Sequence, residues 1–224
     1  MKIAAIIPAL NEEKTISTVV NSVKEFGYYP IVVSDGSTDS TIFKAKQSGA
    51  YVIKHKNSLG YDQSIKTGVK FVLKKNFDFL LVFDADNEIN KDCLEIFRKK
   101  IISKKYSLII GTRNSKPRFS EVIFGYYTKI RYNVPDILSG IKAYSIELCR
   151  KNKEIFDKNT YNTGLAINAL KKKEKFCIVP IKINFLRTQS RIGREFSINL
   201  KILQIMFLEI TQDLKSLLKK VICK

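Results

Sequence analysis

The stretch from Phe79 to Glu88 constrains the fold of this chain more than any other. An apolar run ends at Phe83, and a short run without polar alternation is typical of a strand buried on both faces of a parallel sheet. Asp84, Asp86 and Glu88 follow at alternate positions, so an extended backbone would direct all three carboxylates to one side. We therefore predict an acidic site just past the end of a core strand.

Three carboxylates that converge repel one another unless a cation neutralises them. Mg²⁺ or Mn²⁺ suits such a site, because hard divalent cations prefer oxygen ligands, and either ion would bring a phosphate-bearing substrate with it. The alternative is a polar turn with solvated acids, since acidic residues are common where a strand ends in a turn.

Short apolar strands alternate with helices in the first half of the chain, which predicts parallel βαβ units and an α/β fold with a mostly parallel central sheet flanked by helices. The predicted strands are 3–7, 30–33, 51–54, 79–83 and 106–111. Helices are predicted from a cap at Asn11 to Gly27 and over 41–48, 61–75 and 91–103. Ligands bind such sheets at the carboxyl ends of the strands, so the turns 8–13, 34–40, 84–88 and 111–113 should meet at one edge.

Beyond Arg113 the pattern is less regular. It predicts helices near 121–130, 146–150 and 161–171, short strands before residue 144 and over 177–184, and a lysine-rich amphipathic helical stretch over 197–224. We predict one domain over residues 1–224, with a nucleotide-binding half at 1–113, an acceptor-binding half at 114–197 and a helical tail at 198–224.

The composition is that of a globular protein, with 45% hydrophobic and 27% charged residues. The formal net charge of +19 favours polyanions such as nucleic acid, anionic lipid head groups or sugar phosphates. The lysines are spread along the chain, however, and form no recognition helix, so we expect no nucleic-acid partner. The four cysteines lack metal spacing and predict reduced thiols in a cytoplasmic protein.

Several function classes are disfavoured by missing motifs. The turn after the first strand carries no G-x-G-x-x-G, and the chain has no G-x-x-x-x-G-K-[ST], which argues against a Rossmann dehydrogenase and a P-loop NTPase. The single histidine, His55, lies between two lysines and is predicted to be exposed, so a Ser-His-Asp triad is not expected. No segment predicts a signal peptide or a transmembrane helix.

Taken together, six segments resemble the family-2 glycosyltransferases of GT-A fold, and among them the dolichyl-phosphate mannosyltransferase-like branch. The segments are 7–13 (Ile-Pro-Ala-Leu-Asn-Glu-Glu), 33–39 (Val-Ser-Asp-Gly-Ser-Thr-Asp), Gly60 with Thr67-Gly68, 84–86 (Asp-Ala-Asp), 136–144 (Asp-Ile-Leu-Ser-Gly-Ile-Lys-Ala-Tyr) and 187–191 (Arg-Thr-Gln-Ser-Arg). The resemblance implies a metal-dependent, inverting transfer of one hexosyl group from a nucleotide-diphosphate sugar.

The resemblance also implies roles for individual residues. The nucleotide-binding residues would be Pro8, Leu10, Asn11, Glu12, Asp35, Gly60 and Asp84, with Asp35 bonded to the base and Asp84 near the ribose or donor sugar at the reacting centre. The metal ligands would be Asp86 and Glu88, and the residues near the donor diphosphate or the acceptor would be Arg113, Ser139, Gly140, Arg187 and Arg191. Asp136 would either accept the proton of the acceptor or only position neighbouring residues.

The acceptor implied by the resemblance is a polyprenyl phosphate or a growing surface glycan. The Lys-rich tail could lie on an anionic membrane, so the expected location is cytoplasmic, with peripheral attachment to the inner face of the membrane as an alternative to a tail packed on the core. Two other function classes stay open at this point. A nucleotidyltransferase would need a Gly-rich basic loop after the first strand, where this chain is acidic, and a nucleic-acid-binding protein is suggested by the charge alone.

Overall fold

The structure is a computed structural model that describes residues 1–114, 118–157, 160–184, 199–200, 202–211 and 213. The chain forms two compact units. Unit 1 comprises residues 1–114 and 139–186, and unit 2 comprises residues 115–138 and 187–224. Each unit thus combines two separated segments, whereas the predicted division at 113 and 197 follows the order of the chain.

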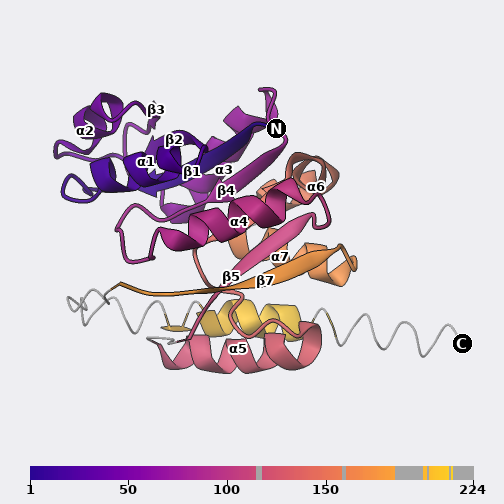
Figure 1. Ribbon diagram of the computed structural model, residues 1–224. Coiled ribbons are helices and arrows are strands. Elements are labelled where there is room, and N and C mark those ends of the chain that lie inside the picture. The colour runs from indigo at the N-terminus through magenta and orange to yellow at the C-terminus, as the bar shows by residue number, and fades with distance from the viewer. Residues whose placement is uncertain (115–117, 158–159, 185–198, 201, 212, 214–224) are drawn as a thin grey trace, which may run out of the picture. The chain divides into compact units, whose positions relative to one another are not determined.

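In the described part of unit 1, seven strands form one sheet in the order β3-β2-β1-β4-β6-β5-β7 (Figure 1). The strands are β1 (Ile3–Ala9), β2 (Tyr29–Ser34), β3 (Tyr51–Lys54), β4 (Phe79–Val82), β5 (Leu108–Arg113), β6 (Lys142–Ser145) and β7 (Phe176–Ile181). Strand β6 is antiparallel to β4 and β5, and the other pairings are parallel. The predicted α/β fold with a mostly parallel sheet is confirmed.

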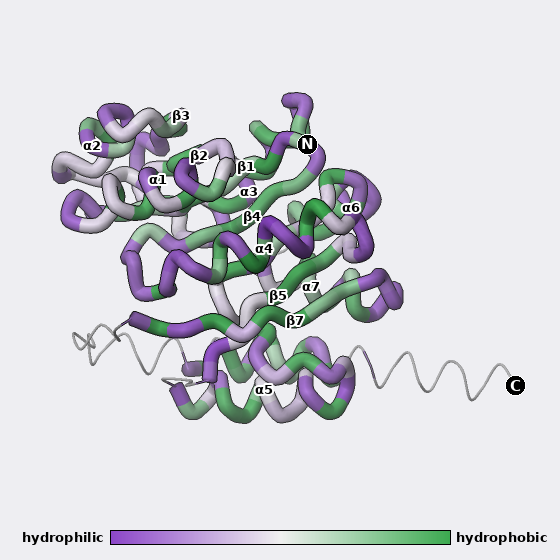
Figure 2. The backbone as a smooth tube through the Cα atoms, in the orientation of Figure 1, coloured by the Kyte–Doolittle hydropathy of each residue, from purple (hydrophilic) through white to green (hydrophobic). Residues whose placement is uncertain are grey.

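Both faces of the sheet carry helices, which explains why the strands are apolar without alternation (Figure 2). The helices of unit 1 are α1 (Ile16–Glu25), α2 (Thr41–Gln47), α3 (Tyr61–Leu73), α4 (Asp92–Ile102), α6 (Ile146–Lys151) and α7 (Tyr161–Lys171), with a 3₁₀ turn at Lys153–Asp157. Ala5 and Ile7 belong to the core cluster that includes the apolar side chains of α1 and α4. Ile6 meets α3 at Gly68, where an added Cβ would lie 2.6 Å from Ile6 Cγ2, so the glycine permits close packing of helix on sheet.

The predicted start of the first helix is wrong. Helix α1 begins at Ile16 after Thr15, and Asn11 is not its cap. Asn11 has a φ of 56°, in the left-handed region that asparagine tolerates better than most residues. The backbone at Asn11 therefore forms a turn and not the start of a helix. The boundaries of the other predicted helices and strands differ from the observed ones by only a few residues.

Unit 2 contains α5 (Phe119–Tyr132) and a second helical segment at 199–200, 202–211 and 213. The predicted helical stretch 197–224 is helical where it is described, and its remainder lies outside the described residues. No helix in the described ranges is both long enough and apolar enough to cross a membrane.

Candidate active site at the carboxyl ends of the strands

The sheet topology brings the predicted polar turns to one edge. Strands β1, β2, β4 and β5 all run in the same direction, so the turns that follow them lie at the same edge of the sheet, as predicted. Because β6 runs in the opposite direction, its beginning lies at that edge. The segment Ser139 to Ile141 therefore joins the turns that follow the parallel strands.

Two of these turns are bonded to each other. The Asn11 amide donates to Ser37 Oγ at 3.1 Å, and Asn11 Oδ1 accepts from the Thr38 amide at 2.9 Å. The Glu12 amide donates to Thr41 Oγ1 at 2.8 Å, so the loop after β1 is tied to the loop after β2. Of the predicted nucleotide-binding residues here, Pro8 is buried in β1, Leu10 and Asn11 are exposed, and Glu12 is half-buried.

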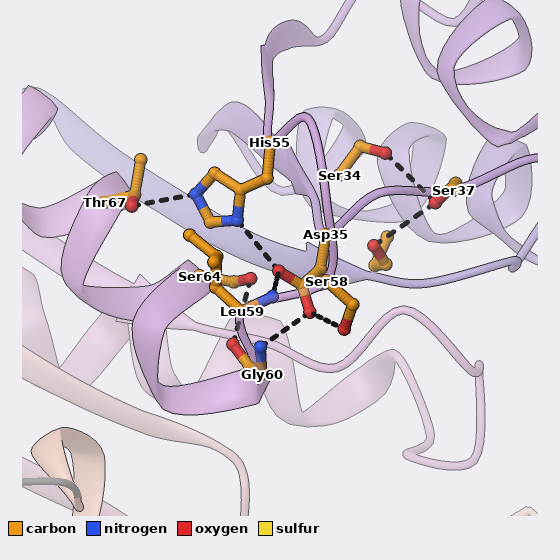
Figure 3. Close-up of polar contacts among 10 residues, drawn as sticks. Ser34, Asp35, Ser37, His55, Ser58, Leu59, Gly60, Ser64 and Thr67 are labelled. Carbon is orange, nitrogen blue, oxygen red and sulfur yellow. Dashed lines mark hydrogen bonds and ion pairs between the residues drawn. The ribbon is translucent and has the colours of Figure 1, made fainter.

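Asp35, just past β2, accepts four hydrogen bonds (Figure 3). Its Oδ1 lies 2.8 Å from His55 Nδ1 and 2.9 Å from the Leu59 amide, and its Oδ2 accepts from Ser58 Oγ at 2.7 Å and the Gly60 amide at 2.8 Å. Burial acts to raise the pKa of Asp35, but these hydrogen bonds outweigh it and lower the pKa to about 2. The carboxylate thereby anchors the loop that leads into α3.

The prediction that His55 is exposed is wrong. The residue is only 9% exposed, and its Nε2 lies 2.9 Å from Thr67 Oγ1 of α3 (Figure 3). The two flanking lysines do not indicate the exposure of His55, because Lys54 and Lys56 are exposed while the residue between them is buried. His55 therefore bridges Asp35 and α3. Since four donors already occupy the acceptor sites of Asp35, the predicted bond from Asp35 to a base requires one of them to be displaced.

Asp84, just past β4, has a different environment. Tyr61, the first residue of α3, donates its hydroxyl to Asp84 Oδ1 at 2.7 Å. Desolvation and the nearby charge of Asp86 raise the pKa of Asp84 to about 6, while the Tyr61 hydrogen bond, Lys142 and Arg113 act in the opposite direction. The site thus combines two neighbouring carboxylates with two cations.

Gly140 makes this arrangement possible. A Cβ at position 140 would lie 1.9 Å from Asp84 Oδ2, so any side chain there would displace the carboxylate. The Gly140 carbonyl accepts from Asn162 Nδ2 at 3.0 Å, and the Tyr144 hydroxyl donates to Asn162 Oδ1 at 2.9 Å. Tyr61, Asn162 and Tyr144 were not predicted as site residues. Tyr61 directly follows Gly60, which is a predicted nucleotide-binding residue. Its place next to Gly60 is the feature of the sequence that could have indicated Tyr61 as a site residue.

The prediction that three carboxylates converge is wrong. The chain turns at Ala85 and Asp86, and Asn87 has a φ of 60°, so the backbone after Asp84 is not extended. Within the described ranges, no group of three or more His, Cys, Asp or Glu side chains is arranged to hold a metal. Asp86 Oδ1 accepts from the Glu88 amide at 3.0 Å within this turn. The assignments of Asp86 and Glu88 as metal ligands stay predictions.

The carboxylates of Asp84 and Asp86 nevertheless fit a cation whose remaining ligands come from its substrate and from water. Mg²⁺ is commonly held by one or two carboxylates together with substrate phosphates and water, not by a cage made of protein ligands alone. The mutual repulsion of Asp84 and Asp86 is what a cation would relieve.

The remaining predicted residues lie in different settings. Ser139 is fully buried, and its Oγ has no hydrogen-bond partner in the described structure, although a buried hydroxyl normally has one. Lys142, also fully buried, donates from Nζ to the Ser139 carbonyl. Asp136 belongs to unit 2 and is 2% exposed, which suits a positioning role better than proton removal from an acceptor. Arg187 and Arg191 lie outside the described residues.

A mostly parallel α/β sheet with polar turns gathered at its carboxyl edge agrees with the predicted GT-A class of fold. Residues 4–172 match the model of glycosyl transferase family 2. The chain belongs to glycosyl transferase family 2.

Two similar proteins are archaeal. An uncharacterized protein of Methanocaldococcus jannaschii is 30% identical over 206 residues, which covers 86% of this chain and 85% of that protein. The UDP-N-acetylglucosamine–dolichyl-phosphate N-acetylglucosaminyltransferase of Methanococcus voltae is 29% identical over 235 residues, which covers 88% of this chain and 91% of that protein.

Solved structures share the fold. Glucosyl-3-phosphoglycerate synthase from Mycobacterium tuberculosis, in complex with Mn²⁺, UDP and phosphoglyceric acid, superposes with a TM-score of 0.68 at 19% identity, and the match covers 92% of this chain and 78% of that one. The same enzyme with phosphoglyceric acid gives a TM-score of 0.70 at 18% identity, with 93% and 79% covered. At this identity the likeness shows the fold alone, and the fold agrees with the predicted one.

Proposed function

We propose that this protein transfers a hexosyl group, with inversion, from a nucleotide-diphosphate sugar to a polyprenyl phosphate, as a member of the dolichyl-phosphate sugar transferase branch of its family. The observation that carries the proposal is the Asp84–Asp86 pair at the end of β4, with Lys142 and Arg113 near enough to act on its charge. Such a mixture of charges suits a diphosphate leaving group, whose negative charge must be held near carboxylates.

The two tied loops after β1 and β2 suit the nucleotide half of the donor. Hydrogen bonds between these loops fix the positions of the predicted residues Asn11 and Glu12, and Leu10 is exposed beside them. The Asp35 network fixes Gly60, which has a φ of 97° and directly precedes α3. Asp84 would meet the donor sugar between these loops and the Ser139–Gly140 segment.

A divalent cation would complete the donor site. Asp86 and Asp84 would hold Mg²⁺ or Mn²⁺, with Glu88 as the further predicted ligand, and the bound ion would neutralise charge on the diphosphate. Neighbours of the same fold were crystallised with these ions. Tyr61 keeps Asp84 oriented, and Gly140 leaves it room.

The polyprenyl-phosphate acceptor is favoured over a growing glycan by the name of the relative from Methanococcus voltae. A phosphate acceptor is already a nucleophile at neutral pH, so the chemistry does not require a general base at Asp136. Ser139, predicted near the acceptor, is fully buried, so its unpartnered hydroxyl would meet an acceptor oxygen only after the segment around it moved. A lipid acceptor also implies a protein that works at a membrane face.

The test is transfer of radiolabelled sugar from UDP, GDP, CDP and dTDP donors to a short-chain polyprenyl phosphate, with and without Mn²⁺ or Mg²⁺. We expect one nucleotide to support transfer and to raise the melting temperature in the presence of metal. Asp86→Ala should abolish both effects, and Asp92→Asn, on the exposed start of α4, should abolish neither. Transfer to a soluble glycan but not to the lipid would refute the proposed acceptor.

A further inference from the structure

Helix α5 of unit 2 has one buried face and one exposed apolar face. Phe124 and Thr128 are fully buried, whereas Phe119 is 76% exposed, Tyr126 64% and Ile130 87%. The spacings of seven and four residues between the exposed side chains place them on one side of the helix, because residues three, four and seven apart share a helix face. Large apolar side chains gathered in this way mark interaction surfaces.

The second helical segment of unit 2 carries further exposed apolar side chains. Its exposed residues include Leu200, Phe207 and Leu208. Hydrogen bonds hold the two segments together, among them the Ser120 hydroxyl to Asn199 Oδ1 and the Arg131 guanidinium to Asp213 Oδ2 at 2.9 Å. Unit 2 is therefore a helical pair that leaves much of its apolar surface uncovered within the described structure.

Among the described residues of unit 2, the exposed charged side chains are all cations. Every acidic residue among its described residues is at most 8% exposed, namely Glu121, Asp136, Glu209 and Asp213. Lys129 and Arg131, in contrast, are exposed on α5 on either side of Ile130. Arg131 is paired with Asp213 at 2.9 Å but stays exposed, and Lys129 is exposed beside it. Within the described residues, an apolar face with cations at its border is complementary to a surface that is apolar inside and anionic outside.

We propose that the apolar face of α5, formed by Phe119, Tyr126 and Ile130 with Lys129 and Arg131 at its border, docks on an anionic lipid surface. The inference rests on the proposed function in one respect, since a polyprenyl-phosphate acceptor is held in a membrane. It is carried by the exposure and the charge of unit 2. A second copy of this chain is a poorer occupant, because a self-pairing face would bring like cations together.

The test is flotation of the full-length protein with vesicles of phosphatidylcholine, alone or mixed with phosphatidylglycerol. We expect binding to the mixed vesicles, weakened by salt. The double variant Phe119→Ser with Ile130→Ser should bind at least about tenfold more weakly, because two exposed apolar side chains no longer enter the lipid. Lys129→Glu should also weaken binding.

Matched controls lie in unit 1. Phe43 is 66% exposed on α2, so Phe43→Ser removes an equally exposed aromatic ring, and Lys74→Glu reverses an exposed lysine after α3. Both control variants should bind vesicles like the unsubstituted protein. Equal binding by the α5 variants and these controls overturns the proposal, as does light scattering that shows a dimer dissociated by Ile130→Ser.

The failure of this proposal can be separated from that of the proposed function. If vesicle binding depends on α5 but no sugar is transferred to polyprenyl phosphate, the docking face is supported and the proposed acceptor is refuted. If the protein transfers sugar in detergent but never binds vesicles, the acceptor is supported and the docking face is refuted. The α5 variants should retain transfer to a detergent-dispersed acceptor, because these side chains are not part of the candidate active site.

Discussion

Asp35 follows β2 and Asp84 follows β4, at the same edge of the sheet. Even so, the pKa values of the two carboxylates are shifted in opposite directions. Asp35 is surrounded by four donors, which lower its pKa to about 2. Asp84 has one hydroxyl donor and a like charge nearby, and its pKa is raised to about 6. Both are just past the ends of core strands, so position in the fold does not decide the difference.

The difference separates a carboxylate that is stabilised by hydrogen bonds within the protein from one that burial and a like charge destabilise. The lone pairs of Asp35 are used within the protein, whereas the charge of Asp84 and Asp86 is only partly compensated. The ionised carboxylate is therefore stabilised at the loop after β2, where Asp35 lies, and destabilised at the end of β4, where Asp84 lies. Functional sites commonly retain such destabilised groups.

The largest expected effect comes from Asp84→Asn, which removes the like-charge pair. We expect transfer activity to fall at least about a hundredfold, as when one electrostatic stabiliser is removed from a reacting centre. Stability should behave in the opposite way. Because the folded pKa is raised, ionisation of Asp84 costs stability as pH rises from about 4 through about 6, so the variant should lose that pH dependence. Urea unfolding at pH 4.5 and pH 7.5 measures it.

Asp86→Asn is a companion variant, because it removes the same pair of like charges from the other residue. It should also lower activity, and it should lower the pKa of Asp84 because the neighbouring charge is gone. An Asp84→Asn protein with unchanged transfer activity would contradict the role of Asp84.

The next effect is that of Gly140→Ala. The new methyl group would overlap Asp84 Oδ2, so the carboxylate or the segment must move. We expect a loss of about 1–3 kcal/mol in the free energy of unfolding, typical of overpacking, together with a fall in kcat. Gly164→Ala is the control, since its nearest neighbouring atom would be 3.6 Å away. Equal losses of stability and activity in the two variants would contradict a specific requirement for glycine at position 140.

Asp35→Asn tests the other side of the comparison. The pKa of about 2, against an ordinary value of 3.8, corresponds to stabilisation on the order of 2 kcal/mol. Because the folded pKa is depressed, this stabilisation is present above about pH 4 and is lost as pH falls toward 2. The variant should therefore be less stable than the parent at pH 7, with the gap closing in acid, as measured by urea unfolding. A gap that does not depend on pH would point to lost packing alone.

The smallest expected effect is that of Tyr61→Phe. Loss of the hydroxyl removes a hydrogen bond that lowers the pKa of Asp84, so that pKa should rise further above its usual range. The acidic limb of the kcat/KM profile should then move to higher pH, with little change in stability. Tyr51→Phe, on β3, serves as the control and should leave the profile unchanged.

Much of this site could be predicted from the sequence, and the rest depended on contacts between distant segments. Apolar runs that end in polar turns identified β1, β2 and β4 and their shared edge. The antiparallel β6 left no such signal, so the approach of Gly140 to Asp84 could not be inferred. His55 was assigned by its charged neighbours, although a strand end places adjacent residues on opposite sides. The supposed convergence of Glu88 with Asp84 assumed an extended backbone where the chain turns.

The division of unit 2 between two separated segments has a consequence for the order of folding during synthesis. Asp213, which accepts from Tyr127 and Arg131, is made 86 and 82 residues after them. At about 5–20 residues per second, α5 waits roughly 4–16 s for this partner. Throughout that interval a nascent chain presents an apolar helix to chaperones and membranes. The rate of translation therefore sets how long α5 remains without this partner.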